Sequence, residues 1–561
     1  MLNSLSSLRD ASSPFQAPSS LQPFETPAMP RSRGALLGYG PPSVRARADR
    51  GARTDNDCLV RLIGYCPRPS AEILAQAYRG GDWTRLGGDF VLVADAGEDV
   101  HVVSSALATI PYFYAVDEGR RFLHDSNVFR LARRLGEPWR WSERALRCLS
   151  LFGHTLGTDT LHSRIFRVPP GAHLHWNGQE LRQLASRLPS AWTDPSLSAN
   201  PSDALRDSLL ALVRGFLELP DGPLVLSLSA GFDSRLLLAL ALRYRRPARA
   251  VTMGFADSTD VVVAKQLASG VGLPITTVEL VPQDYVAVAR EAVWRTGGTK
   301  TAENWHTLIY PRRADISSRD VHVIGANGEF ARTYLLRDRL AQLGTLPDEL
   351  TGASWVMRLA RARARLHRAW RFIGAAGTAS AADDLRYAMR LVPRQANVAD
   401  RLDLFYALMR VRHFIGNGLA LYAAHGQPCS PFLDGGWMDA TLRVPRAQKL
   451  RGYYHRWAID QLAPSLSSLP FNGLAFASLE APAKLAGPFR GYGAFSQAIE
   501  LPALCERLIE DQRLERFLPR AARREVVQRR ARHDMSLLWT LSLAAEWAEW
   551  AESDQPAPSF A

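Results

Sequence analysis

The sequence predicts an α/β plus α+β protein, in which an antiparallel β-sandwich precedes a parallel-sheet α/β part and a helical C-terminal part. From residue 56 to about residue 190, short apolar and β-branched runs alternate with hairpin signals such as "DAGED" and "WNGQ". From about residue 200, strand-like and helix-like segments alternate with short connections, which is typical of a parallel sheet. Beyond about residue 335 the pattern is helical, with loops such as "HGQPCSPFLDGG".

The length of 561 residues predicts more than one domain. We expect a disordered leader at 1–55, because it is rich in Ser, Pro and Arg and lacks periodicity. One domain is expected at 56–195 and a second at 200–561. The leader lacks a signal peptide's basic start and apolar segment, and no run of 18 apolar residues predicts a membrane span.

The five cysteines are scattered and form no CxxC pair, which fits a reducing cytoplasm. The 13 histidines include no HExxH and no Cys/His metal spacing, so no structural zinc is expected. The net charge of +13 is compatible with a nucleic-acid partner, but the arginines are spread along the chain. Compositional bias with local anion sites is the favoured interpretation, and we expect no nucleic acid. The arginines of segment 354–372 are read as a solvated helix face rather than a docking surface.

The individual elements follow from these patterns. In the first part, we expect strands within 58–66, 89–105, 110–126 and 171–181, and a helix at 127–136. In the second part, helices are expected at 202–219, 234–245 and 260–272. Strands are expected at 223–229, 249–255, 275–280 and 321–326.

The stretch "PLVLSLSAGFDSRLLLALAL" places a small polar loop between a buried strand and a helix that begins near Phe232 or Asp233. The small residues from Ser229 to Gly231 allow backbone N–H groups to approach a ligand, at a helix N-terminus that favours anions. The hydroxyls of Ser229 and Ser234 add hydrogen-bond donors, and the loop is therefore a candidate phosphate site. Asp233 would repel a bare phosphate, so a Mg²⁺ ion is expected between them. An ordinary βα turn with an aspartate cap explains the loop alone equally well.

Further motifs make the pattern specific. "SLSAGFDSRLLLA" resembles the S-G-G-x-D-S pyrophosphate loop of the N-type ATP pyrophosphatases, and together with "TMGFADSTDVVVAKQLA" it resembles the synthetase domain of the asparagine synthetase family. "SPFLDGGWMDATLRVP" is similar to that family's late P-F-L-D motif, which contains Asp434. "LGGDFVLVAD" and "DTLHSRIFRVPPGAHLHW" resemble its glutaminase-type (Ntn-type) domain. The resemblance covers roughly residues 56–480.

The resemblance implies that ATP binds along the loop formed by Leu228, Ser229, Ala230, Gly231, Phe232, Asp233 and Ser234. The adenine would lie near Leu228, Met253 and Phe255. The family's second phosphate-side motif corresponds to "GANGEFA", which brings Gly325 and Gly328 to the site. Asp233 and Glu329 would hold Mg²⁺. ATP and Mg²⁺ are thus the expected cofactors.

The sequence also departs from the family. A working glutaminase of this type needs a cysteine directly after Met1, where Leu2 stands. Cys58 and Cys66 lie in apparent strands, where burial would make them inert, so we expect the 56–195 domain to lack the catalytic cysteine. Asn327 stands where asparagine synthetases carry Glu and β-lactam synthetases carry Tyr, and Phe330 replaces the family Asp, with Glu329 as its substitute. A family lysine is absent from "LPFNGLAF", where Asn472 stands. Lys449 is its candidate replacement, or a surface residue.

The sequence keeps the residues of the adenylation half-site but changes those of the acceptor half-site. This combination resembles the lasso peptide cyclases. This implies that an Asp or Glu side chain of a precursor peptide is adenylated and then attacked by the peptide's N-terminal amine, with Asn327, Glu329, Asp434 and Lys449 as candidate catalytic residues. Expected partners are the precursor peptide, a leader peptidase and a leader-recognition protein. The alternatives are a divergent asparagine or β-lactam synthetase acting on a small molecule, an RNA-modifying pyrophosphatase, and a non-catalytic binding protein.

Overall fold

The computed structural model describes residues 36–37, 59–118, 121–194, 201–301, 305, 307–333, 335, 383–395, 397–469, 502–529 and 535–552. Most of the predicted leader, the arginine-rich segment 354–372 and Asn472 lie outside these residues.

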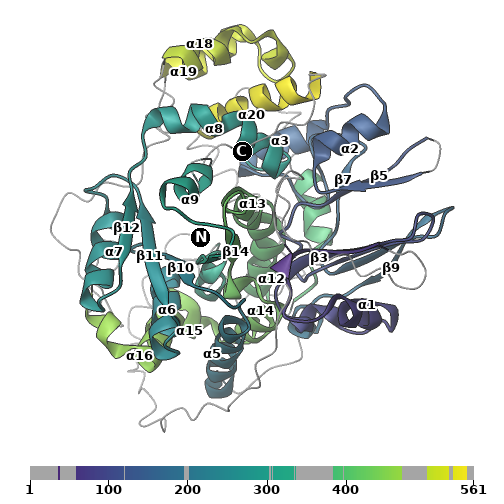
Figure 1. The fold of residues 1–561 in the computed structure, drawn as a ribbon. Helices are drawn as coiled ribbons and strands as arrows, with labels where there is room; N and C mark the ends of the chain where they lie inside the picture. The colour runs from purple at the N-terminus through teal and green to yellow at the C-terminus, as the bar shows by residue number, and fades with distance from the viewer. Residues whose placement is uncertain are drawn as a thin grey trace, which may run out of the picture. The chain divides into compact units, whose positions relative to one another are not determined.

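Antiparallel strands form two sheets in the first part of the chain (Figure 1). The larger sheet has the order β1 (Leu36–Leu37), β2 (Leu59–Tyr65), β3 (Asp89–Asp95), β4 (Val100–Ser104), β8 (Ala172–Trp176) and β9 (Leu181–Ser186). The smaller sheet has the order β6 (Phe122–Asp125), β5 (Phe113–Val116) and β7 (Phe166–Arg167). The predicted antiparallel strands are confirmed, and β1, which falls within the predicted leader, pairs with β2.

Both sheets contribute side chains to one apolar core. Val91 and Val102 of the larger sheet share this core with Phe122 of the smaller one, whose ring stacks on Trp176 at 6.1 Å between centroids. A second core, which includes Leu92 and Val103, packs against α1 (Ser70–Tyr78). Alternate residues of β3 and β4 thus enter different cores, because side chains point alternately to the two faces of a strand.

A parallel sheet forms the second part of the chain, as the sequence predicts. Its order is β12 (Ile275–Val278), β11 (Ala248–Met253), β10 (Leu224–Ser227), β13 (Val321–Val323) and β14 (Gln427–Cys429). The connecting helices are α5 (Pro201–Leu217), α6 (Phe232–Arg243), α7 (Thr259–Gly270) and α8 (Pro282–Thr296). The prediction of a loop at "HGQPCSPFLDGG" is wrong for Gln427–Cys429, which pair with β13 as an edge strand. A proline is tolerated there because an edge strand has one unpaired side.

The strand order changes direction at β10. The chain proceeds from β10 through β11 to β12 on one side, and then returns to place β13 on the other side of β10. Open α/β sheets bind ligands outside the carboxyl ends of the strands at such a switch point. The loop that follows β10 therefore occupies the position at which this fold class forms its sites.

The remaining described segments are largely helical. The N-terminal part carries α2 (Val128–Leu135), as predicted, and α3 (Glu143–Phe152). In the C-terminal part, α12 (Val398–Phe405) continues as a π-helix (Tyr406–Gly416) into α13 (Asn417–Tyr422). They are followed by α14 (Gly435–Leu442), α15 (Arg446–Lys449), α16 (Tyr453–Leu462), α18 (Pro502–Glu510), α19 (Arg520–Arg529) and α20 (Met535–Glu552). Among the helices of the described residues, none has the length and apolar character needed to cross a membrane.

Candidate active site

A cavity of about 390 Å³ opens at the carboxyl ends of β10, β11 and β13. This volume lies within the usual range for small-molecule sites. Residues of the predicted ATP site that line the cavity are Leu228, Ser229, Gly231, Asp233, Ser234, Met253, Gly325 and Glu329. Further along the chain, α13 and the π-helix contribute Gly418, Tyr422 and Ile415. The cavity is thus lined by segments that lie far apart in the sequence.

The loop between β10 and α6 is held by its own polar side chains. Ser229 N–H donates to Ser234 Oγ at 3.1 Å, and Gly231 N–H donates to Ser229 Oγ at 3.1 Å. Ala230 N–H donates to Asp260 Oδ1 of α7 at 2.9 Å. The expectation that this turn presents free N–H groups is therefore wrong for these three residues, because side chains shape the turn. The first turn of α6 begins directly after it, with Gly231 as N-cap.

Asp233 is the centre of a partly buried charged cluster. Its Oδ2 accepts a hydrogen bond from Arg332 at 2.7 Å, and its Oδ1 lies 2.8 Å from His455 Nε2. Burial alone would raise the pKa of Asp233, but Arg332 and His455 outweigh this effect and lower it. The repulsion between Asp233 and a phosphate, on which the Mg²⁺ prediction rested, is thus offset by a guanidinium that sequence reasoning missed.

Glu329 lines the same cavity, and its pKa is shifted in the opposite direction from that of Asp233. Its Oε1 accepts a hydrogen bond from the Tyr406 hydroxyl at 2.6 Å. Burial raises the pKa of Glu329, and the neighbouring charge of Asp233 raises it further. Two carboxylates with opposite pKa shifts therefore lie at one site, which is a frequent property of functional sites.

Two glycines allow the 325–328 turn to lie against Asp233. A Cβ atom added at Gly325 would lie 2.9 Å from the Cβ of Asp233. At Gly328 it would lie 2.4 Å from both Cγ and Oδ1 of the same carboxylate. Both residues, predicted as cofactor-binding, are thus needed by packing to keep the turn close to the loop. Gly325 also lines the cavity.

Lys300 is a cavity residue that sequence reasoning missed. Its side chain is buried, and Nζ lies 4.6 Å from the ring centroid of Phe414. The backbone around it pairs with the N-terminal part, because Lys300 forms a bridge with His154 and Thr301 N–H donates to Gly153 O at 2.9 Å. Gly297, at φ +60°, ends α8 just before this segment. The only local signal was a lysine after the turn-forming pair in "TGGTK".

The family model described as Asparagine synthase matches residues 204–552, which is more than half of the chain. The chain belongs to the asparagine synthase family. The match begins in α5 and ends in α20, so it includes the parallel sheet and the whole cavity lining. No curated protein matches the chain. Membership supports an ATP-dependent amide-forming ligase.

Enzymes of the asparagine synthase family use ATP, typically with Mg²⁺. Asp233 and Glu329 fit such an ion in chemical type, because carboxylate oxygens are the ligands that Mg²⁺ prefers and both line the cavity. The close approach of Arg332 means that Asp233 already has one cationic partner. Met253, predicted to lie near the adenine, lines the cavity, whereas Ala230, Phe232 and Phe255 do not.

Asn327, which replaces the family glutamate, is turned away from the cavity. It has φ +75° and is fully buried, and its Nδ2 donates to Phe432 O at 2.7 Å. Nδ2 also lies 3.2 Å from the sulfur of Met438. The Asn327 side chain thus ties the turn to the "SPFLDGG" segment.

Asp434 also lies outside the cavity lining. It is the N-cap of α14, where its carboxylate accepts hydrogen bonds from Trp437 N–H at 3.0 Å and from Gly88 N–H at 3.1 Å. Burial raises the pKa of Asp434, although the hydrogen bonds from these two N–H groups act to lower it. The geometry gives this family-motif aspartate a structural task, which is to join the β3 entry of the N-terminal sheet to α14.

Lys449 is buried, so its interpretation as a surface residue is wrong. Its Nζ donates to Leu442 O at 3.3 Å and lies 4.0 Å from Asp403 Oδ2 and 5.9 Å from the ring centroid of Phe330. Burial lowers the pKa of Lys449 and raises that of Asp403 to about 6. The ammonium does not line the cavity, so Lys300 is the lysine that the fold brings to the site.

The described cysteines are all buried. Burial raises the pKa of the Cys66 thiol, next to β2, to about 12, and that of Cys429 to about 12 as well. It raises the pKa of Cys148 well above its usual value. The prediction that Cys66 is inert is consistent with these surroundings, and Cys58 lies outside the described residues.

Proposed function

We propose that this chain is an ATP-dependent macrolactam synthetase of the lasso peptide cyclase type, acting on a ribosomally made precursor peptide. The carrying observation is the state of the described cysteines. Because those thiols are buried, we expect none of them to reach glutamine as the nucleophile that releases ammonia. The amine acceptor is then expected to arrive with the substrate. A peptide that carries both its N-terminal amine and an Asp or Glu side chain satisfies this requirement.

In the first half-reaction, a substrate carboxylate oxygen attacks the α-phosphorus of ATP. The bond to the pyrophosphate oxygen breaks, which gives an acyl-adenylate and pyrophosphate. The N-terminus of α6 and the buried ammonium of Lys300 stabilise the phosphate charge. Asp233 and Glu329 would hold the Mg²⁺ ion, which neutralises phosphate charge when bound. Arg332 and Tyr406 orient these two carboxylates.

In the second half-reaction, the peptide amine attacks the acyl carbon and AMP leaves. The amine proton passes to water. A pre-folded peptide places its two reacting ends together, so positioning supplies most of the rate enhancement. This accounts for the turned-away Asn327, since such an acceptor half-site needs little acid–base machinery. The leader peptidase and leader-recognition protein would deliver the peptide.

The test uses the full chain, ATP, Mg²⁺ and candidate core peptides from neighbouring genes. The expected result is pyrophosphate exchange together with AMP release and loss of one water from the peptide by mass spectrometry. An N-acetylated peptide should keep pyrophosphate exchange but lose ring closure. A peptide with Asn or Gln in place of the ring carboxylate should lose both. Adenylation of free aspartate with ammonia as acceptor would instead identify a small-molecule amide synthetase.

A further inference from the structure

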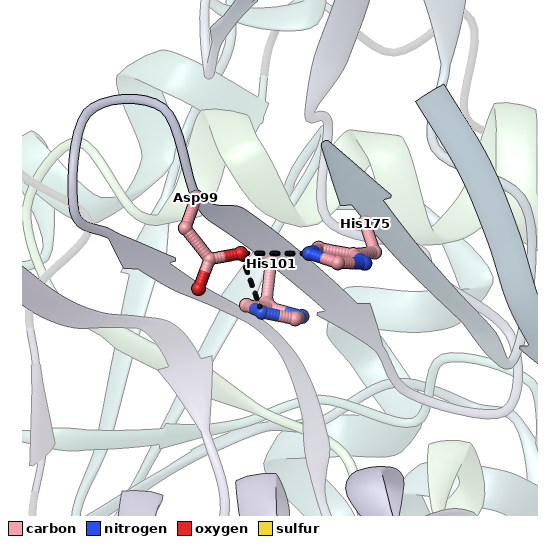
Figure 2. A group of neighbouring side chains, drawn as sticks. All are labelled: Asp99, His101 and His175. Atoms are coloured by element: carbon pink, nitrogen blue, oxygen red, sulfur yellow. Dashed lines mark hydrogen bonds and ion pairs between the residues drawn. The ribbon is translucent and has the colours of Figure 1, made fainter. Parts of the chain in front are cut away.

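A group of potential metal ligands lies on the larger antiparallel sheet, and none of its members lines the cavity (Figure 2). Asp99 comes from the turn between β3 and β4, His101 from β4 and His175 from β8. One atom from each residue lies within 4.8 Å of the others. Within the described part of the chain, these residues are the one such group of three.

The strand period and register bring the group together. In "VHVVS" and "AHLHW" the histidines alternate with apolar residues that enter the core, so they share the opposite face. His101 lies directly opposite His175 in the β4–β8 register. Asp99 is two residues before His101 and reaches the same face from the turn. His173 is two residues before His175 on β8, so its side chain lies on the same face.

The distances are close to those of a metal site. Asp99 Oδ1 lies 3.2 Å from His101 Nε2 and 2.7 Å from His175 Nε2. With Zn–N and Zn–O distances of about 2.0–2.1 Å, tetrahedral ligand atoms are about 3.3 Å apart. The first distance already matches. The second requires a small opening of the Asp99 side chain, which is 61% exposed and has room to move. The two imidazole rings stack with their centroids 4.2 Å apart, and one ligand nitrogen of each ring lies within 4.8 Å of the other.

His173 holds the buried ligand in place. His173 Nε2 lies 3.0 Å from His101 Nδ1, so one of these two nitrogens carries the shared proton. When His101 Nδ1 carries it, the lone pair of the neutral ring is on Nε2, which points to Asp99. Protein metal sites commonly orient a histidine ligand by a hydrogen bond to its other nitrogen. The Tyr78 ring packs edge-on against both His101 and His173 and limits their rotation.

We propose that Asp99, His101 and His175 bind one Zn²⁺ ion, with water as the fourth ligand. Two imidazole nitrogens and one carboxylate oxygen suit zinc, whereas Mg²⁺ and Ca²⁺ prefer oxygen ligands alone. The ion would cross-link the β3–β4 turn to β8 and so stabilise the pairing of these interior strands. The site is separate from the Asp233–Glu329 pair, and its existence does not depend on the proposed reaction.

The test is zinc binding by the full chain, without an oligohistidine tag and after treatment with a chelator. Zn²⁺ alone is titrated in competition with a chromogenic zinc indicator, and the thermal unfolding midpoint is measured in parallel. The variants are Asp99→Asn and His175→Ala, both at partly exposed side chains. His124→Ala is the matched control, because His124 also faces a single carboxylate, at 3.6 Å, without a second imidazole in the group.

The expected result is one Zn²⁺ per chain, affinity lowered at least tenfold in Asp99→Asn and His175→Ala, and unchanged affinity in His124→Ala. Zinc should raise the unfolding midpoint of the wild type but not of the two ligand variants. Excess Mg²⁺ should not displace it. Absence of stoichiometric binding, or equal binding by wild type and both ligand variants, would overturn the proposal and leave the group as a hydrogen-bonded cluster.

Discussion

Replacing Gly328 by alanine tests whether ATP–pyrophosphate exchange depends on the close contact between the 325–328 turn and Asp233. The added Cβ would lie 2.4 Å from Cγ and Oδ1 of Asp233, and ordinary contacts begin near 3.4 Å. Either the turn or the carboxylate must therefore shift by about 1 Å. A misplacement of this size costs about 10²-fold in rate when it affects a catalytic arrangement. Gly328 does not have a positive φ, so the effect is steric.

The assay is ATP–pyrophosphate exchange, with ATP affinity measured by calorimetry and folding by thermal unfolding. We expect about a 10²-fold loss of exchange in Gly328→Ala, with a folded protein. Gly270→Ala is the matched control. Gly270 is the last residue of α7, and a Cβ added there would have its nearest neighbour, Leu469, at an ordinary van der Waals distance of 3.8 Å. That variant should keep full activity. Exchange by Gly328→Ala within threefold of wild type would refute the reasoning, since the Asp233 geometry would then not matter.

Three further predictions concern charged residues. Lys300→Met should lower the rate of AMP formation by about 10²-fold, because the cavity loses a buried cation from its lining, and Lys300→Arg should restore part of the rate. Steady-state kinetics measure both variants, and unchanged rates would remove Lys300 from the site. The pKa of Asp403 is raised to about 6 in the folded chain, so the native state binds the proton more tightly than the unfolded state and stability falls as pH rises from about 4 to about 6. This contribution is about 3 kcal/mol, and urea unfolding at several pH values should show the fall in the wild type but not in Asp403→Asn. Asp434→Ala should lower the unfolding free energy by about 1–2 kcal/mol through loss of the α14 cap, while calorimetry finds ATP affinity unchanged; a selective loss of ATP affinity would contradict the structural role of Asp434.

Local patterns were sufficient for the strand, loop and helix from Leu224 to Arg243, because apolar periodicity and small turn residues act over a few positions. They failed at Gln427–Cys429, where three residues with a central proline carry no alternation. That segment becomes a strand only because β13 supplies its hydrogen-bond partners. The cluster of His101 and His175 likewise has no signal in local spacing, because these histidines meet only through the β4–β8 register.

The sequence by itself determined the antiparallel sheet, the parallel sheet and the position of the small polar loop at Ser229–Ser234 after β10. The family motifs also placed Asp233 and Glu329 at one site, and both line the cavity. Only the tertiary structure decided which charges meet them. His455 and Lys300 reach the site from segments far from both carboxylates in the sequence, and Arg332 reaches Asp233 across 99 positions. Burial together with these neighbouring charges then shifts the pKa values of Asp233 and Glu329. Coulomb energies depend on distance in space and on the surrounding dielectric, and neither quantity is encoded in local spacing.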